Sequence, residues 1–218
     1  MSISENIIKF KASLPNGITL VAVTKTKPVS DIMQAYETGH RVFGENKIQE
    51  MESKWRDMPK DVEWHMIGHV QSNKVKHMAS FVSLIHAVDS LKLLKEINKQ
   101  AARHDRVIRC MLQIKIAREE SKFGMHEDDA RVLLTSEETK SMENVKIVGL
   151  MGMATFTDDD DQIRSEFQRL KRFYDSLKDV HDFTELSMGM SGDYTIAIEE
   201  GSNMIRIGSA IFGARNYS

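Results

Sequence analysis

The sequence predicts a single α/β domain, a (β/α)8 TIM barrel in which eight parallel strands alternate with helices. Short apolar runs of strand length alternate with segments of helical periodicity along the whole chain. The 218 residues match the size of one such barrel, which needs roughly 200 to 250. No G-x-G-x-x-G follows the first predicted strand, which disfavours an open doubly wound sheet. No linker rich in Pro, Gly or Ser interrupts residues 1–218, so we expect one domain.

The first half of the chain contains four predicted strands separated by helices. Ser2 and Glu5 have the spacing of a capping box and begin an N-terminal helix. Ser30 and Asp89 precede amphipathic segments and are placed to cap the helices there. The predicted strands cover residues 20–23, 41–44, 63–68 and 81–88, and the helices after them end near residues 39, 58, 78 and 101.

The second half repeats the alternation. Four acidic residues, 158–161, precede its longest helix, where negative charge suits the helix dipole; they lack the spacing of a calcium loop. The predicted strands cover residues 107–116, 146–153, 184–188 and 203–207, one helix covers 127–138, and the longest helix carries Ile163, Phe167, Leu170, Tyr174 and Leu177 on one face.

Composition excludes several classes of protein. A net charge of -2 gives no attraction to nucleic acid or to an anionic membrane. The single cysteine, Cys110, forms no intrachain disulfide, and its apolar surroundings favour a buried structural thiol in a reducing compartment. The N-terminus lacks the pattern of a signal peptide, and no segment has the length and apolarity of a membrane span. We therefore expect a cytoplasmic protein.

Lys25 is the principal candidate for chemistry, because it lies at the exit of the buried strand 20–23. A lysine held partly dry at a strand end is biased toward its neutral amine, which can attack a carbonyl to form a Schiff base. The alternative is an ordinary exposed lysine at the end of a strand.

Two glycine-rich turns predict a phosphate site. The sequences SMGMSGD, from Ser187, and RIGSAIFG, from Arg206, each supply serine hydroxyls and closely approachable backbone N–H groups before a helix. Barrels frequently bind phosphate with the loops after strands seven and eight. A lysine facing a phosphate indicates either a sugar-phosphate aldolase or a protein that binds pyridoxal 5′-phosphate (PLP). Arg206 lies on the same side of its strand as Gly208; it can either face a pyridine nitrogen or form a salt bridge at the barrel rim.

Polar residues also follow other strands, including Glu45, Asn46 and His69. His65 and His69 have four-residue spacing, but they fall on a strand and its turn rather than on a helix. No cysteine or carboxylate pattern joins them, so we expect no metal site.

Seven motifs together resemble the pyridoxal phosphate homeostasis protein family, whose barrel is similar to the N-terminal domain of alanine racemase. The motifs are VAVTKTKP, FGENKIQE, WHMIGHVQSNK, SKFGM, GLMGMA, LSMGMSGDY and GSNMIRIGSAIFGARNYS, in the family's order over residues 21–218. Thr24 stands where serine is common and Val70 where leucine is common; neither change removes a polar group that the site needs.

The resemblance implies that Lys25 holds PLP as an internal aldimine and that Arg206 faces the pyridine nitrogen. It further implies that Ser191, Gly208 and Ser209 bind the phosphate, and that Asn46, Met151, Ser187 and Met188 line the pocket.

Two functions remain open: a PLP-binding protein that buffers or delivers the cofactor without turnover, and an amino-acid racemase. Racemisation needs proton transfer on both faces of the substrate. Related racemases take the second acid/base, a tyrosine, from an additional C-terminal domain and a partner subunit, whereas this sequence ends at Ser218. Tyr194 and His69 are nearby candidates, but neither matches that role by motif. We therefore expect a monomeric carrier that is not an enzyme, with PLP-dependent apoenzymes as recipients.

Overall fold

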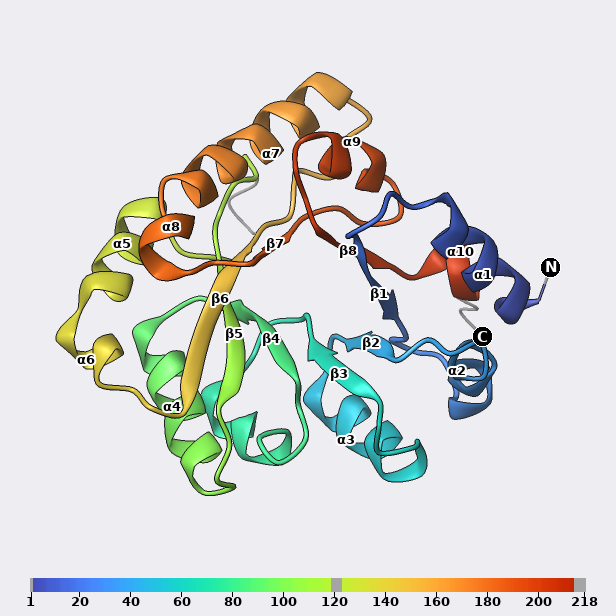
Figure 1. The fold of residues 1–218 in the computed structure, drawn as a ribbon, viewed down its shortest axis with the longest axis horizontal. Coiled ribbons are helices and arrows are strands. Elements are labelled where there is room, and N and C mark those ends of the chain that lie inside the picture. The colour runs from blue at the N-terminus through green and yellow to red at the C-terminus, as the bar shows by residue number, and fades with distance from the viewer. Residues whose placement is uncertain (1, 119–122, 214–218) are drawn as a thin grey trace.

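The computed structural model describes residues 2–118 and 123–213, which fold as a closed parallel barrel surrounded by helices (Figure 1). The strands pair in chain order, and the last pairs with the first: Thr19 lies opposite Met204, and Ala22 opposite Ile207. The predicted (β/α)8 architecture is therefore confirmed. The strands are β1 (Thr19–Val23), β2 (Val42–Glu45), β3 (Glu63–Met66), β4 (Leu84–Val88), β5 (Ile108–Gln113), β6 (Val145–Met151), β7 (Glu185–Ser187) and β8 (Met204–Ile207).

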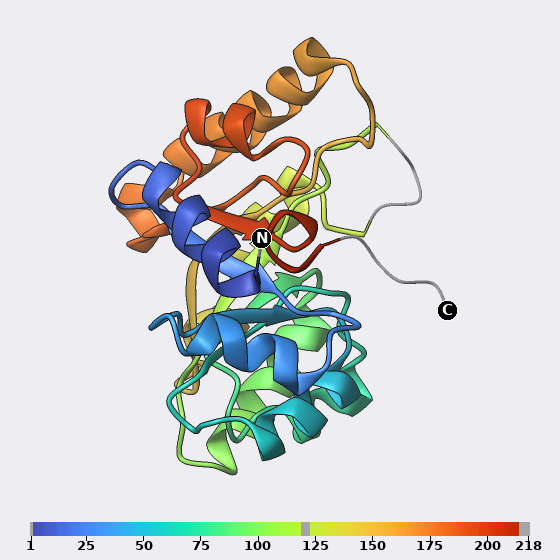
Figure 2. The same cartoon turned by 90° about the vertical axis from the view of Figure 1, so that its right-hand side faces the viewer.

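Helices cover the outside of the barrel. The capping box is present, because Ser2 Oγ accepts from Glu5 N and Ser2 N donates to Glu5 Oε2. The first and last helices lie side by side (Figure 2), joined by a hydrogen bond from Asn6 to the Ile211 carbonyl. The helices are α1 (Ile3–Ser13), α2 (Val29–Tyr36), α3 (Ile48–Asp57), the 3-10 helix η1 (Ser72–His77), α4 (Leu91–Ala102), α5 (Glu127–Thr135), α6 (Glu137–Lys140), α7 (Asp160–Asp175), α8 (Lys178–His181), α9 (Tyr194–Glu199) and α10 (Ser209–Phe212).

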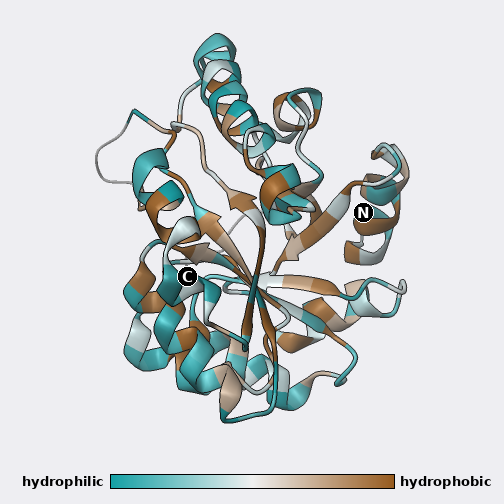
Figure 3. Ribbon diagram, turned by 60° about the vertical axis from the view of Figure 1, so that its left-hand side comes forward, coloured by the Kyte–Doolittle hydropathy of each residue, from teal (hydrophilic) through white to brown (hydrophobic). Residues whose placement is uncertain are grey.

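Alternation along the strands creates two apolar layers. Val21 and Met204 point into the barrel lumen, whereas Ala22 and Ile205 pack outward against the helices. Figure 3 shows mostly apolar residues along the central strands and a mixture of hydrophilic and apolar residues along the surrounding helices. In the described part of the chain, no helix combines the length and apolarity needed to cross a membrane.

Several predicted boundaries were wrong for local reasons. Ser90, not Asp89, caps α4, because its hydroxyl accepts from Leu93 N. Ser30 lies inside α2, which begins directly after Pro28. Ser136 interrupts the helix predicted over 127–138, since its backbone is extended and its hydroxyl accepts from Thr139 N.

Candidate functional site

A cavity of 540 Å³ lies at the carboxyl ends of the strands. Six of the nine predicted site residues line it, and they come from the first, second, seventh and eighth strand ends. The lining comprises Lys25, Asn46, Ser191, Arg206, Gly208 and Ser209, together with Val23, Lys27, Ile67, Met153, Ala154, Thr155, Phe156, Thr157, Asp158, Ile163, Met190, Gly192, Asp193 and Gly213.

The other three predicted residues lie outside this lining. Met151 belongs to the apolar cluster in the lumen, and Met188 is buried in the layer between strands and helices. Ser187 is fully buried beneath the cavity lining, and its hydroxyl accepts a hydrogen bond from the cavity residue Arg206. The family resemblance predicts all three as pocket residues, whereas the side of each strand on which they lie and their depth along it keep them out of the cavity lining.

Lys25 is half-buried at the cavity, two residues after the end of β1. Its neighbour Thr24 is buried, and its other neighbour, Thr26, has a positive φ of 65°. Lys27 is a second lysine on the cavity, which the sequence reasoning did not single out. Its Nζ lies 2.8 Å from the Phe212 carbonyl oxygen, so α10 holds it at the rim.

Arg206 is almost completely buried and is held in place by neutral acceptors. Its guanidinium donates to Ser187 Oγ at 2.5 Å and to the Gly152 carbonyl at 3.1 Å. Burial lowers the pKa of Arg206 to about 10, so the group stays protonated at neutral pH. The sequence left open a salt bridge between Arg206 and a carboxylate at the barrel rim, but Arg206 forms no salt bridge among the described residues.

A chain of buried polar groups continues from Arg206 into the lumen. His86 Nδ1 lies 3.2 Å from Ser187 Oγ, and His86 Nε2 lies 3.1 Å from His65 Nδ1. Burial lowers the pKa of His65 to about 3 and that of His86 well below its ordinary value, so both rings are neutral at pH 7. Arginine only donates, so a Ser187 hydroxyl that accepts from Arg206 remains able to donate to His86.

The two glycine-rich turns meet beside this arginine. Gly208 N donates to Ser191 Oγ at 3.4 Å, and Arg206 N donates to the Gly189 carbonyl. Gly189 has a φ of +92°, and a Cβ there would lie 2.7 Å from the Cβ of Ala197. Glycine is therefore required at this position to bring the two turns together.

The loop after β6 forms another wall of the cavity. Glu166 of α7 is buried and accepts from the Thr155 backbone N at 2.6 Å and from its hydroxyl at 2.8 Å. Phe156 follows at the rim with 95% of its surface exposed. The sequence patterns do not single out Thr155, Phe156 or Glu166, which lie beyond the predicted strand over 146–153.

The remaining predicted candidates lie away from the cavity lining. His69 stacks on Phe123 and pairs with Asp89, so it diverges from the lumen residue His65. Tyr194 packs against Phe10 of α1. Residues 2–118 and 123–213 contain no group of three or more His, Cys, Asp or Glu side chains arranged to hold a metal.

Sequence comparisons identify the relatives of this chain. It matches the family model for the alanine racemase N-terminal domain over residues 1–216. A pyridoxal phosphate homeostasis protein of Vibrio alginolyticus is 39% identical over 210 residues, covering 94% of this chain and 89% of the relative. One from Aquifex aeolicus is 36% identical over 205 residues, covering 93% and 89%. The chain belongs to the pyridoxal phosphate homeostasis protein family.

Solved structures agree with this family assignment. PipY of Synechococcus elongatus, described with PLP bound, superposes with a TM-score of 0.88 at 32% identity, covering 97% of this chain and 100% of PipY. An alanine racemase of Clostridium difficile has a TM-score of 0.78 at 14% identity, and the match covers 57% of that chain. The racemase likeness shows a shared barrel fold.

Proposed function

We propose that this homeostasis-family protein binds PLP on Lys25 and buffers or delivers the cofactor inside the cell. The observation that carries the proposal is the convergence of Lys25, Arg206 and both glycine-rich turns on one cavity. The homeostasis proteins of Vibrio and Aquifex and the PLP-bound PipY support it.

The donor set fits the cofactor. PLP supplies an aldehyde, which a lysine amine can attack, and a phosphate dianion. Ser191, Ser209 and the first backbone N–H groups of α10 offer donors suited to that phosphate, since the first N–H groups of a helix lack intrahelical acceptors. Arg206, held protonated, suits an unprotonated pyridine nitrogen. Asn46 is proposed to contact the ring at the second strand end.

The proposed role is that of a carrier rather than a racemase. Tyr194, considered as a second acid/base, packs on α1, and His69 pairs with Asp89. Neither belongs to the cavity lining. Because one chain supplies every proposed cofactor contact, we also propose that a cytoplasmic monomer is the active form, with PLP-dependent apoenzymes as recipients.

Borohydride reduction followed by peptide mass spectrometry tests the site. The expected result is a stable PLP adduct on the Lys25 peptide, absent from Lys25→Ala and retained in Lys27→Ala. Labelling of Lys27 instead, or unchanged visible absorbance in Lys25→Ala, would contradict the assignment.

Activity and transfer assays test the carrier role. The loaded protein is expected to reactivate a PLP-dependent apoenzyme and to form no D-alanine from L-alanine above the rate for free PLP. Sustained racemisation that disappears in Lys25→Ala would establish the racemase instead. Light scattering measures the molar mass in solution and tests the proposed monomer, for which the mass of one chain, 24.9 kDa, is expected.

A further inference from the structure

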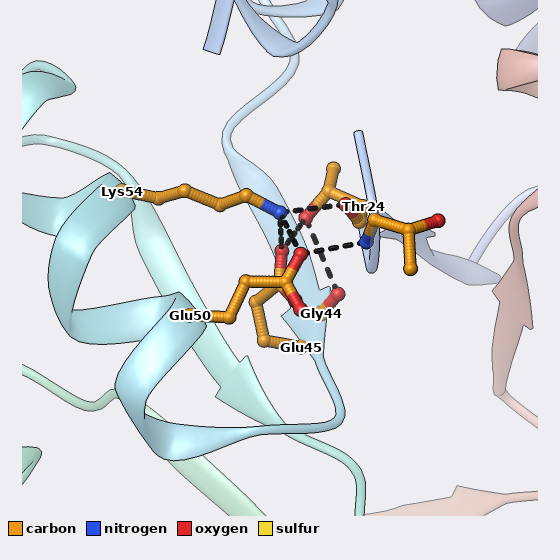
Figure 4. Close-up of polar contacts among 6 residues, drawn as sticks. Thr24, Gly44, Glu45, Glu50 and Lys54 are labelled. Carbon is orange, nitrogen blue, oxygen red and sulfur yellow. Dashed lines mark hydrogen bonds and ion pairs between the residues drawn. The ribbon is translucent and has the colours of Figure 1, made fainter. Parts of the chain in front are cut away.

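A buried charged cluster joins Thr24, the residue before Lys25, to side chains of β2 and α3 (Figure 4). We call Thr24, Glu45, Glu50 and Lys54 the Lys54 cluster. Lys54 Nζ lies 2.8 Å from the Thr24 carbonyl oxygen, 2.7 Å from Glu45 Oε1 and 2.6 Å from Glu50 Oε1. An ammonium has three donors, so these three acceptors satisfy it.

Burying the charged groups of this cluster carries a large desolvation penalty, and one of its carboxylate oxygens has no hydrogen-bond partner among the described residues. Lys54 is 6% exposed and Glu45 is 0% exposed. Glu45 Oε1 also accepts from the Thr24 hydroxyl at 2.5 Å, yet its Oε2 is buried without a hydrogen-bond partner among the described residues. Replacing a buried ion pair by apolar residues of similar volume is often neutral or even stabilising. Stability alone therefore does not account for the Lys54 cluster, and its position next to Lys25 suggests a second role.

The same cluster holds a strained residue beside Lys25. Thr26 has a φ of +65°, a conformation that is a genuine outlier for a β-branched side chain. Its backbone N–H donates to Glu50 Oε1 at 2.6 Å. Glu50 thus connects Lys54 to Thr26, and strain of this kind persists where surrounding contacts hold it.

Lys25 lies between the two residues that the cluster holds. Lys54 fixes the carbonyl of Thr24, and Glu50 fixes the N–H of Thr26. We propose that Glu50 and Lys54 are positioning residues that keep the backbone turned at Thr26 and so direct the Lys25 amine into the cavity. This inference rests on the proposed function, in which Lys25 carries PLP.

A glycine rescue separates positioning from general stabilisation. Glycine adopts positive φ without the penalty that threonine has. Glu50→Ala is expected to lower the apparent affinity for PLP, read from the visible absorbance and the borohydride-trapped fraction, by about tenfold. Thr26→Gly in the Glu50→Ala background is expected to restore most of that loss. The matched control, Glu52→Ala on the same helix, removes a partly buried carboxylate that pairs with Arg56 and His77 and, among the described residues, makes no hydrogen bond or ion pair with the Lys54 cluster; it is expected to bind PLP as the parent does.

A second measurement needs no cofactor. Trace acetylation of the free protein is expected to change the reactivity of Lys25 relative to Lys27 in Glu50→Ala and to return toward the parental ratio in the double variant. Unchanged PLP affinity and Lys25 reactivity in Glu50→Ala would overturn the inference, as would a folded double variant without rescue. Failure of the parent protein to label Lys25 with PLP would instead contradict the proposed function, while the acetylation ratio would still decide whether Glu50 positions Lys25.

Discussion

The Arg206 guanidinium and the Ser187 hydroxyl are joined by a hydrogen bond of 2.5 Å beneath the cavity. This contact links the eighth strand to the seventh and continues through His86 to His65. A buried arginine keeps one orientation only while its acceptors remain in place, because leaving a buried donor unpaired is costly. The orientation of Arg206 therefore depends on residues that do not line the cavity.

Ser187→Ala is expected to lower the unfolding free energy by about 1–3 kcal/mol, since a buried N–H donor of Arg206 and the buried Nδ1 acceptor of His86 both lose their partner. Apparent affinity for PLP is expected to fall several-fold because Arg206 loses a fixed orientation. Urea unfolding and PLP titration measure the two effects. Ser202→Ala is the control: this buried serine bonds the backbone of Leu186, Met188 and Met204, so stability should fall without loss of affinity. Equal losses of affinity in both variants would argue against a specific role for Ser187.

Acid is expected to destabilise the fold between pH 7 and pH 5. Burial lowers the pKa of His65 to about 3 and of His40 to about 4, below the unfolded value near 6.5. In that pH range the unfolded chain binds more protons, so stability is present above pH 6.5 and is lost as the pH falls. Each such histidine contributes about 2 kcal/mol of this loss. Urea unfolding at several pH values measures it, and His40→Gln should reduce the slope; an unchanged slope would contradict the assignment.

Gly68→Ala is expected to disturb the turn that carries Asn46. A Cβ at Gly68 would lie 2.3 Å from the Asn46 carbonyl oxygen and 2.7 Å from its Cα, both backbone atoms. Overpacking of this kind costs about 1–3 kcal/mol and moves the backbone. Gly192→Ala is the matched control, since a Cβ at Gly192 would have no neighbouring atom within 4 Å among the described residues. Similar unfolding free energies for the two variants would contradict the predicted clash.

Glu166→Gln is expected to loosen the loop after β6. The amide that replaces one carboxylate oxygen cannot accept from the Thr155 N–H and hydroxyl as the carboxylate does. Chymotrypsin should then cut after the exposed Phe156 several-fold faster, as followed by mass spectrometry. Glu137→Gln, which alters an exposed pair with Lys140, should leave the rate unchanged. Equal cleavage rates in the parent and Glu166→Gln would show that Glu166 does not hold the loop.

The alternation of strand and helix patterns was sufficient to predict the barrel, and position at strand ends was sufficient to place Lys25, Asn46 and Arg206 on one cavity. Periodicity describes a segment and its immediate neighbours, so it cannot show contacts between distant segments. Ser187 and His86 are 101 positions apart in the sequence, and only the packed lumen brings them together.

Local conformation was also beyond the sequence reasoning. Nothing in the pattern TLVAVTKTKP marks Thr26 as left-handed, because its N–H partner, Glu50, is 24 residues away on α3. The observed cap of α4 lies one residue after the predicted cap for a comparable reason. Asp89 pairs with His69, a contact that the local pattern does not reveal, and Ser90 caps the helix.

Pairing of β1 with β8 has a consequence for biosynthesis. Lys25 follows the first strand and Arg206 belongs to the last strand. The ribosome therefore synthesises these two cavity residues near the beginning and near the end of translation. A ribosome-bound chain that has not yet released β8 contains Lys25 without Arg206 or the final glycine-rich turn. In the proposed function, loading of PLP on Lys25 therefore requires that β8 has closed the barrel.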